Sequence, residues 1–267
     1  MGRPLRHEQF QHDEIAIVHC VQRCVRRAYL AGVDAVSGKD YSHRREWIRR
    51  RFEALASVFV IDVLSYAILS NHLHVILRNR PDVLDNLTDE EIVIRWLRVF
   101  PGRRIEEQLA EPSEIDVQRI LANPEQVTKI RSRLTDISWF MRALAEPIAR
   151  IANRQDECTG RFWEGRFKAQ RIVDDAGLLA CAMYVDLNPV RAAMASSPEE
   201  SVHTSVYDRI EAEKGTKIPS AAFDLVPITQ EESVAQRRKS LEEQREDRKA
   251  KRKRNAKQVP RDSWLSP

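Results

Sequence analysis

The chain has 267 residues, of which 42% are hydrophobic and 31% charged, as in a globular protein with one ordinary domain and additions, or two small domains. With only 8 glycines and no Gly-rich phosphate-binding motif, the sequence argues against the usual nucleotide-binding loops, and no apolar run approaches the roughly 20 residues that cross a bilayer. The net charge of +4 arises in residues 231–267, which hold 12 Lys and Arg against 7 Asp and Glu, whereas the rest of the chain holds 32 against 33. Any anion-binding surface on the body must therefore be a local patch.

The four cysteines are irregularly spaced, which favours reduced thiols in a cytoplasmic protein over a disulfide framework. Residues 1–11 are polar and lack the apolar core of a signal peptide. Cys20 and Cys24 could supply two ligands of a zinc site, but both fall in a predicted strand, and the sequence favours buried thiols.

The first predicted elements are a strand and a helix. Residues 15–24 alternate and are rich in β-branched side chains, which predicts a strand with His19 and Arg23 on one face. Asp40 is expected to cap the helix that follows. At helical spacing the apolar side chains form one stripe, made of Trp47, Ile48, Phe52, Leu55 and Phe59. Four arginines are expected to lie off this stripe: Arg44, Arg45, Arg49 and Arg50.

A hairpin follows, and its second strand carries two histidines. The turn Ser70-Asn71 after a strand over residues 59–69 is so short that it predicts antiparallel pairing. Because successive side chains of a strand point to opposite faces, His72 and His74 share one face, and the other face holds Leu73, Val75 and Leu77. Two imidazoles can fill two positions around a metal ion, so a third ligand must come from elsewhere in the chain.

Residues 82–134 are predicted to form a helical insertion between core elements. Thr88 and Glu91 form a capping box for a helix that ends at Pro101, and further helices are expected after Arg103 and from Pro124. No group of residues there suggests chemistry.

The second half of the core is predicted as a helix, a strand and a helix. The first helix covers residues 136–153, and Pro147 should bend or break it. Residues 166–173 are expected to form the strand. The last helix covers residues 174–187 and should end at Asn188-Pro189, because a residue before proline resists helical geometry.

In order the core reads strand, helix, strand, strand, helix, strand, helix. This order predicts an α+β fold with a ferredoxin-like or RRM-like antiparallel sheet and the histidine strand near its middle. We expect one domain over residues 1–215. Residues 216–267 are expected to be a linker and a charged tail that is disordered or loosely helical.

The last predicted helix supplies candidates for the third ligand and for a nucleophile. Tyr184 and Asn188 are four residues apart, so a phenol and a carboxamide lie on one helical face. Two imidazoles and one amide oxygen leave several positions of Mg²⁺ or Mn²⁺ open for phosphate and water. Such an ion can polarise a phosphodiester, and the tyrosine can then act as the nucleophile.

At these residues the sequence resembles the single-tyrosine HUH transposases, in particular the REP-associated tyrosine transposases. Three segments carry the likeness: His72-Leu73-His74, residues 160–171 ahead of the last helix, and the Tyr-x-x-x-Asn-Pro-Val-Arg pattern that starts at Tyr184. The likeness covers roughly residues 14–80 and 135–207 and leaves out the insertion and the tail. In the smallest relatives the residue four after the tyrosine is usually glutamine, whereas Asn188 is one methylene shorter.

The resemblance implies an HUH endonuclease fold that cleaves and rejoins single-stranded DNA without an energy cofactor. Tyr184 would attack the scissile phosphate, leaving a free 3′-hydroxyl and a 5′-phosphotyrosine link, while His72, His74 and Asn188 hold Mg²⁺ or Mn²⁺. The expected partner is single-stranded or hairpin DNA, with a nucleoid-associated cytoplasmic location, a homodimer as one option, and no membrane contact. The basic residues expected to contact DNA are Arg23, Arg26, Arg27, Arg161, Arg166, Lys168 and Arg171.

Plainer interpretations stay open beside this one. The two histidines could be a solvent-facing pair, Tyr184 a packing residue, Asn188 a helix-end residue, and the basic residues a solvated strand face. His19 is expected to be structural. The alternative function is a domesticated DNA-binding protein that recognises a sequence or hairpin without moving DNA. A replication or conjugation nickase is less favoured, because no helicase region is present.

Overall fold

The structure is a computed structural model. It describes residues 14–25, 30–34, 37–101, 104–105, 108–109, 112–223, 225, 232, 243, 246–247, 249–251 and 256–267. Within these ranges no helix combines the length and the apolarity that a membrane crossing requires.

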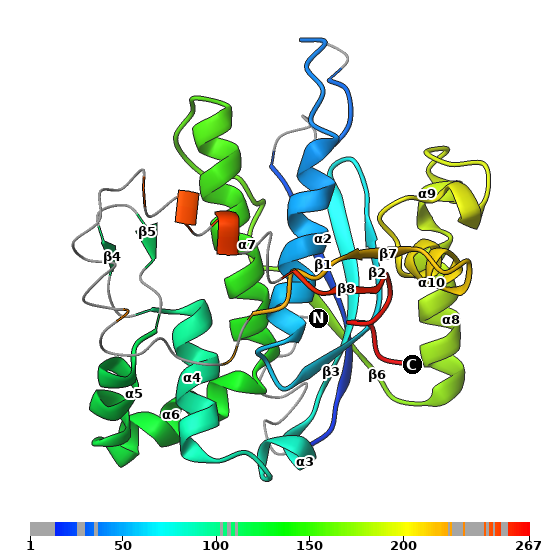
Figure 1. The fold of residues 1–267 in the computed structure, drawn as a ribbon. Coiled ribbons are helices and arrows are strands. Elements are labelled where there is room, and N and C mark those ends of the chain that lie inside the picture. Colours follow the sequence, from blue (N-terminus) through cyan, green and yellow to red (C-terminus); the bar gives the residue numbers. More distant parts are fainter. Residues whose placement is uncertain are drawn as a thin grey trace.

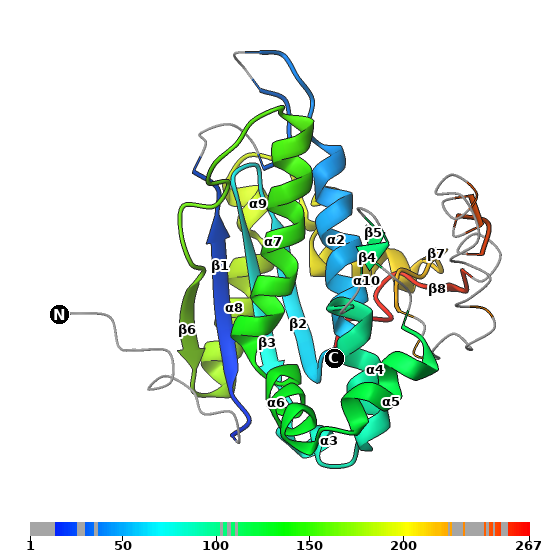
Figure 2. The same cartoon turned by 90° about the vertical axis from the view of Figure 1, so that its left-hand side faces the viewer.

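The core is a four-stranded antiparallel sheet in the order β2-β3-β1-β6 (Figures 1 and 2). Its strands are β1 (Ile17–Arg23), β2 (Ile61–Ile68), β3 (His72–Asn79) and β6 (Lys168–Ile172). The histidine strand β3 lies inside the sheet, between β2 and β1. The predicted α+β ferredoxin-like sheet is therefore confirmed.

Helices cover the two faces of the sheet unequally (Figure 1). One face packs against α2 (His43–Ala56) and α7 (Ile137–Gln155) in the main hydrophobic core. The other face packs against α8 (Asp175–Asp186) in a small second cluster. Helices α9 (Asn188–Arg191) and α10 (Ser205–Glu213) follow α8, with a 3₁₀ turn at Pro198–Glu200 between them.

The insertion is helical, as predicted, but one of its helices starts later than expected. It contains α3 (Pro81–Leu84), α4 (Asp89–Val99), α5 (Glu114–Leu121) and α6 (Pro124–Leu134). The capping box of Thr88 and Glu91 is confirmed.

The helix expected directly after Arg103 is wrong. The described residues there form the short strands β4 (Arg104–Ile105) and β5 (Gln108–Leu109), and α5 starts only at Glu114, behind the capping residue Ser113. A capping box favours a helix start, and Ser113 forms one with Asp116 ten positions after Arg103.

The start of α2 also differs from the prediction. Asp40 does not cap the helix: its carboxylate accepts a hydrogen bond from the Ser42 backbone N–H, and the helix begins at His43. The expectation that the arginines of α2 lie off its buried face is wrong for Arg44 and Arg49, each 1% exposed. Their partners, Asp156 and Asp208, are more than 100 residues away in sequence, so the local pattern could not reveal them.

Pro147 does not break α7, which continues through it. A proline cannot donate to the carbonyl four residues earlier, here that of Ala143. Arg51 on α2 donates to this carbonyl from both Nε and Nη2 at 3.1 Å, so the acceptor is satisfied. Burial lowers the pKa of Arg51 to about 10, which still leaves it charged at neutral pH.

The end of the chain packs on the body. The strands β7 (Lys217–Pro219) and β8 (Gln258–Pro260) pair, and Trp264 then stacks with Tyr66 and Phe52 at ring-centre distances of 5.2 and 6.3 Å. The expected linker and tail over residues 216–267 is therefore wrong for these described ends. Much of the charged stretch between them lies outside the described residues.

A buried carboxylate ties this terminal segment to the core. Asp208 on α10 is 0% exposed and accepts hydrogen bonds from Arg49 at 3.0 Å, Tyr66 Oη at 2.8 Å and Arg261 at 2.5 Å. Two arginines and a phenol therefore meet at one buried carboxylate, and Arg49 has Glu53 as a second, more distant acidic partner at 3.7 Å.

We predict that Asp208→Ala lowers the free energy of unfolding by about 3–5 kcal/mol, because Arg261 loses its carboxylate partner and Arg49 keeps Glu53 only at 3.7 Å. Urea denaturation measures this loss. The matched control is Asp82→Ala, which removes a solvent-exposed partner of Arg80 and should leave the midpoint nearly unchanged. Equal midpoints for the two variants would contradict the structural role of Asp208.

Candidate active site

Three histidines gather on the face of the sheet that α8 covers. His72 and His74 point to this face from β3, whereas Leu73, Val75 and Leu77 lie in the main core on the other face, as predicted. The antiparallel register places Val21 of β1 beside His74 and Arg23 beside His72. His19, one step further along β1, completes the cluster.

Hydrogen bonds orient the rings. His72 Nδ1 lies 2.6 Å from Asn71 Oδ1, and because that oxygen only accepts, Nδ1 carries the proton and Nε2 keeps its lone pair. His74 Nδ1 lies 2.9 Å from His19 Nε2, and the two rings stack with centres 5.1 Å apart. His19, expected to be structural, thus contacts a predicted ligand directly.

The histidines are neutral at physiological pH. Burial lowers the pKa of His19, and burial with the nearby Arg23 lowers that of His72. His74 is 4% exposed, and burial, followed by the charges of His19 and His72, lowers its pKa to about 3. Neutral imidazoles with free lone pairs are the form that a metal ion binds.

The end of α8 brings a phenol and an amide to these rings. The Asn188 amide Nδ2 is 3.3 Å from His74 Nε2. The Tyr184 ring centre lies 5.6 Å from that of His74 and 6.3 Å from that of His19, and the side chain is 41% exposed. The residues predicted to form one site are therefore neighbours in space, although more than 100 residues separate the histidines from the helix.

The helix does not stop sharply before Pro189 as expected. Leu187 keeps right-handed helical angles, and α9 starts directly at Asn188 with Pro189 in its first turn, where a missing N–H costs nothing. Asn188 therefore continues the helical face of Tyr184. Arg191 extends the same face, with its guanidinium carbon 5.3 Å from the Tyr184 ring centre. No role for Arg191 was predicted from the sequence, although its spacing of three residues from Asn188 places both on one helical face.

A polar clasp attaches this end of α8 to the sheet. Asp186 accepts hydrogen bonds from Ser205 Oγ at 2.5 Å, Ser65 Oγ at 3.3 Å and the Val206 N–H at 3.2 Å. Burial raises the pKa of Asp186, against the effect of these bonds. The clasp matters because Val185 is the one side chain of α8 that is fully buried.

The predicted DNA-contacting residues do not form one patch. Arg23 and Lys168 are exposed and share the histidine face, with Lys168 opposite Val21. Arg171 points to the other face and pairs with Glu14 at 3.2 Å, whereas Arg161 and Arg166 are exposed in the segment before β6. Arg26 and Arg27 lie outside the described residues. The interleaved aromatic residues are buried, as expected: Phe162, Trp163 and Phe167.

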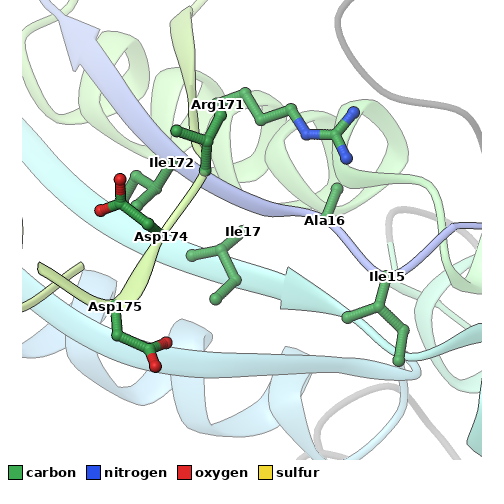
Figure 3. A pocket seen from close by; sticks show the side chains of 8 residues that line it. Ile15, Ala16, Ile17, Arg171, Ile172, Asp174 and Asp175 are labelled. Carbon is green, nitrogen blue, oxygen red and sulfur yellow. The ribbon is translucent and has the colours of Figure 1, made fainter. Parts of the chain in front are cut away.

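A hollow of about 260 Å³ lies away from the histidines, where β1 begins and β6 ends (Figure 3). Ile15, Ile17 and Ile172 line it together with Arg171 and Asp174. Asp174 already accepts the Gly177 N–H as the cap of α8.

The donor set can be tested against a divalent cation. In the described part of the chain, no three His, Cys, Asp or Glu side chains are arranged to hold a metal ion, so a site here requires the Asn188 amide. The amide atom that lies 3.3 Å from His74 Nε2 is the nitrogen, so the carboxamide must rotate by half a turn to bring its oxygen near the separation of about 3 Å between neighbouring ligands of one ion. Two imidazoles and an amide oxygen fit Mn²⁺, and fit Mg²⁺ less well, because Mg²⁺ prefers oxygen.

Comparisons of the sequence and the fold with known proteins do not by themselves assign a function. No protein-family model and no curated protein matches the sequence. Among solved structures the chain is similar to "Structure of the REP associates tyrosine transposase bound to a REP hairpin", with a TM-score of 0.43 and 12% identity, over 80% of this chain and 88% of that chain. A likeness of this size does not by itself support a function.

We predict that Asp186→Ala loosens the helix that carries Tyr184. The variant leaves two hydroxyls and one N–H without their acceptor, a loss of about 1–3 kcal/mol, so hydrogen exchange along α8 should accelerate by about tenfold or more. Asp186→Asn keeps an accepting oxygen and should exchange like the unaltered protein, as should Glu213→Ala at an exposed site on α10. Fast exchange in all three variants, or in none, would argue against the clasp.

Proposed function

We propose that this protein is a metal-dependent single-stranded DNA nickase and strand transferase of the single-tyrosine HUH transposase type. The observation that carries the proposal is the contact of Tyr184 and Asn188 with His74, whose ring centre lies 4.9 Å from that of His72. A phenol alone or a histidine pair alone has plainer explanations. Together, with both histidines neutral and the tyrosine accessible, they form the parts of a phosphoryl-transfer site.

The phenol of Tyr184 is the nucleophile in this proposal. Its oxygen attacks the scissile phosphorus, a bond from phosphorus to the tyrosine oxygen forms, and the bond from phosphorus to the 3′ oxygen breaks. The leaving strand takes up a proton as a 3′-hydroxyl, and the phenol proton is lost to solvent. Attack by another 3′-hydroxyl reverses the step, so the strands are rejoined without ATP.

His72, His74 and Asn188 would hold Mg²⁺ or Mn²⁺. When bound, such an ion polarises the phosphate and offsets the negative charge that builds up on it. The chain's own residues supply the orientation. Asn71 and His19 contact the two imidazoles at Nδ1, so an ion would bind at Nε2 of each ring, where it would replace the contact between His74 Nε2 and the Asn188 amide nitrogen.

The proposed substrate is single-stranded DNA, next to a hairpin in the targets that the sequence resemblance implies. The exposure of Tyr184 supports access for a strand, and exposed Arg23 and Lys168 share the face of the histidines, where they can attract its phosphates. A domesticated DNA-binding protein that no longer moves DNA is the outcome to expect if DNA binds but no covalent adduct forms.

We predict that the protein forms a covalent adduct with labelled hairpin-bearing single strands drawn from a randomised pool, in the presence of Mn²⁺. The adduct should survive denaturation, because it is a phosphotyrosine bond, and should vanish in Tyr184→Phe. Tyr207→Phe on α10 is the matched control and should keep the full yield. An adduct that persists in Tyr184→Phe would refute the assigned nucleophile, and its absence from the unaltered protein would refute the enzymatic function.

We predict that His19→Ala weakens Mn²⁺ binding by about 10- to 100-fold, because His74 loses the partner that orients its ring. Titration followed by the electron paramagnetic resonance signal of free Mn²⁺ measures this affinity without DNA. His43→Ala, on α2 and away from the cluster, should bind Mn²⁺ like the unaltered protein. Unchanged affinity in a folded His19→Ala variant would show that His19 only packs against His74.

A further inference from the structure

Arg191 lies beside the ring of Tyr184, the residue that the proposed function makes the nucleophile. Tyr184, Asn188 and Arg191 are spaced by four and three residues across the continuous α8–α9 junction, so they share one face. The guanidinium carbon of Arg191 is 5.3 Å from the Tyr184 ring centre. Both side chains are exposed, so a strand from solvent can reach them together.

No carboxylate neutralises this arginine within the described residues. Arg23, one of the arginines predicted to contact DNA, differs in this respect, since its Nε lies 3.6 Å from Glu164 Oε1. An exposed contact between a cation and an aromatic ring is weak, so the Tyr184 ring does not by itself account for the placement of an otherwise unpaired charge. An incoming phosphate anion would account for this placement.

The geometry of attack brings such an anion to Arg191. A reacting phosphorus must approach the tyrosine oxygen to about 3–3.5 Å, which puts the non-bridging phosphate oxygens beside the end of the ring. The planar guanidinium presents paired N–H donors that match two such oxygens. Negative charge on these oxygens is redistributed in the transition state, and a positioned arginine stabilises it there.

We propose that Arg191 is a catalytic residue that binds the non-bridging oxygens of the scissile phosphate. This inference rests on the proposed strand-transfer function. In this proposal two cationic groups offset the negative charge of the phosphate. One is the metal ion that His72, His74 and Asn188 would hold, and the other is the guanidinium of Arg191.

The test compares two strands that differ in one charge. The first is a strand that the unaltered protein cleaves, and the second carries a neutral methylphosphonate at the mapped cleavage position. Binding of both is measured in the uncleaving Tyr184→Phe background, with and without Arg191→Gln. Arg150→Gln is the matched control, since Arg150 is an exposed arginine on α7, across the sheet.

Arg191→Gln should weaken binding of the natural strand about tenfold and leave binding of the methylphosphonate strand within about twofold. Arg150→Gln should weaken neither strand. In the protein with Tyr184 intact, Arg191→Gln should slow single-turnover adduct formation by at least about 100-fold, and Arg191→Lys should recover part of the rate because it keeps the charge without the fork.

Equal weakening of both strands by Arg191→Gln, or an unchanged adduct rate, would overturn the role of Arg191 while leaving the strand-transfer function in place. If the unaltered protein forms no adduct with any strand, the strand-transfer function and the role of Arg191 fail together.

Discussion

The two-residue period of β3 is the constraint on which the candidate site depends. Leu73, Val75 and Leu77 are fully buried under α2 and α7, and each contributes about 1.5–3 kcal/mol when it is removed from water. A slip of one residue would move these side chains to the face under α8 and place the imidazoles in the main hydrophobic core. β3 forms backbone hydrogen bonds with β1 on one side and with β2 on the other, and both pairings set its register. The hydrophobic core thereby orients His72 and His74 without touching them.

The two faces of the sheet serve different purposes. The face under α2 and α7 is densely apolar, whereas the face under α8 has a small cluster and leaves Leu179 and Met183 of α8 more than half exposed. A helix attached by so little apolar surface relies on polar contacts, here those of Asp186 with Ser65 and α10. The same thin cover keeps Tyr184 within reach of a strand from solvent. Access to the nucleophile and weak burial of its helix are thus two results of one arrangement.

Helix α2 links distant parts of the chain through three arginines. Arg44 pairs with Asp156 at the end of α7, Arg51 satisfies the carbonyl that Pro147 leaves free, and Arg49 meets Asp208 and the backbone of Arg261. Each guanidinium donates hydrogen bonds to a residue outside α2, and these bonds offset the cost of burying its charge.

The sequence by itself determined the order of the core elements, the face of the two histidines, and the spacing that puts Tyr184 and Asn188 together. These features follow from local periodicity and capping, which act within a few residues. Only the tertiary structure decided that Arg44 and Arg49 are buried, that the chain end packs on α2, and that His19 and Arg191 join the site. The partners of Arg44, Arg49 and the chain end lie more than 100 residues away, and that of His19 lies 55 residues away across the sheet, so no local pattern encodes these contacts. Arg191 shares a helical face with Tyr184, and the tertiary structure decided only that this face meets the histidines.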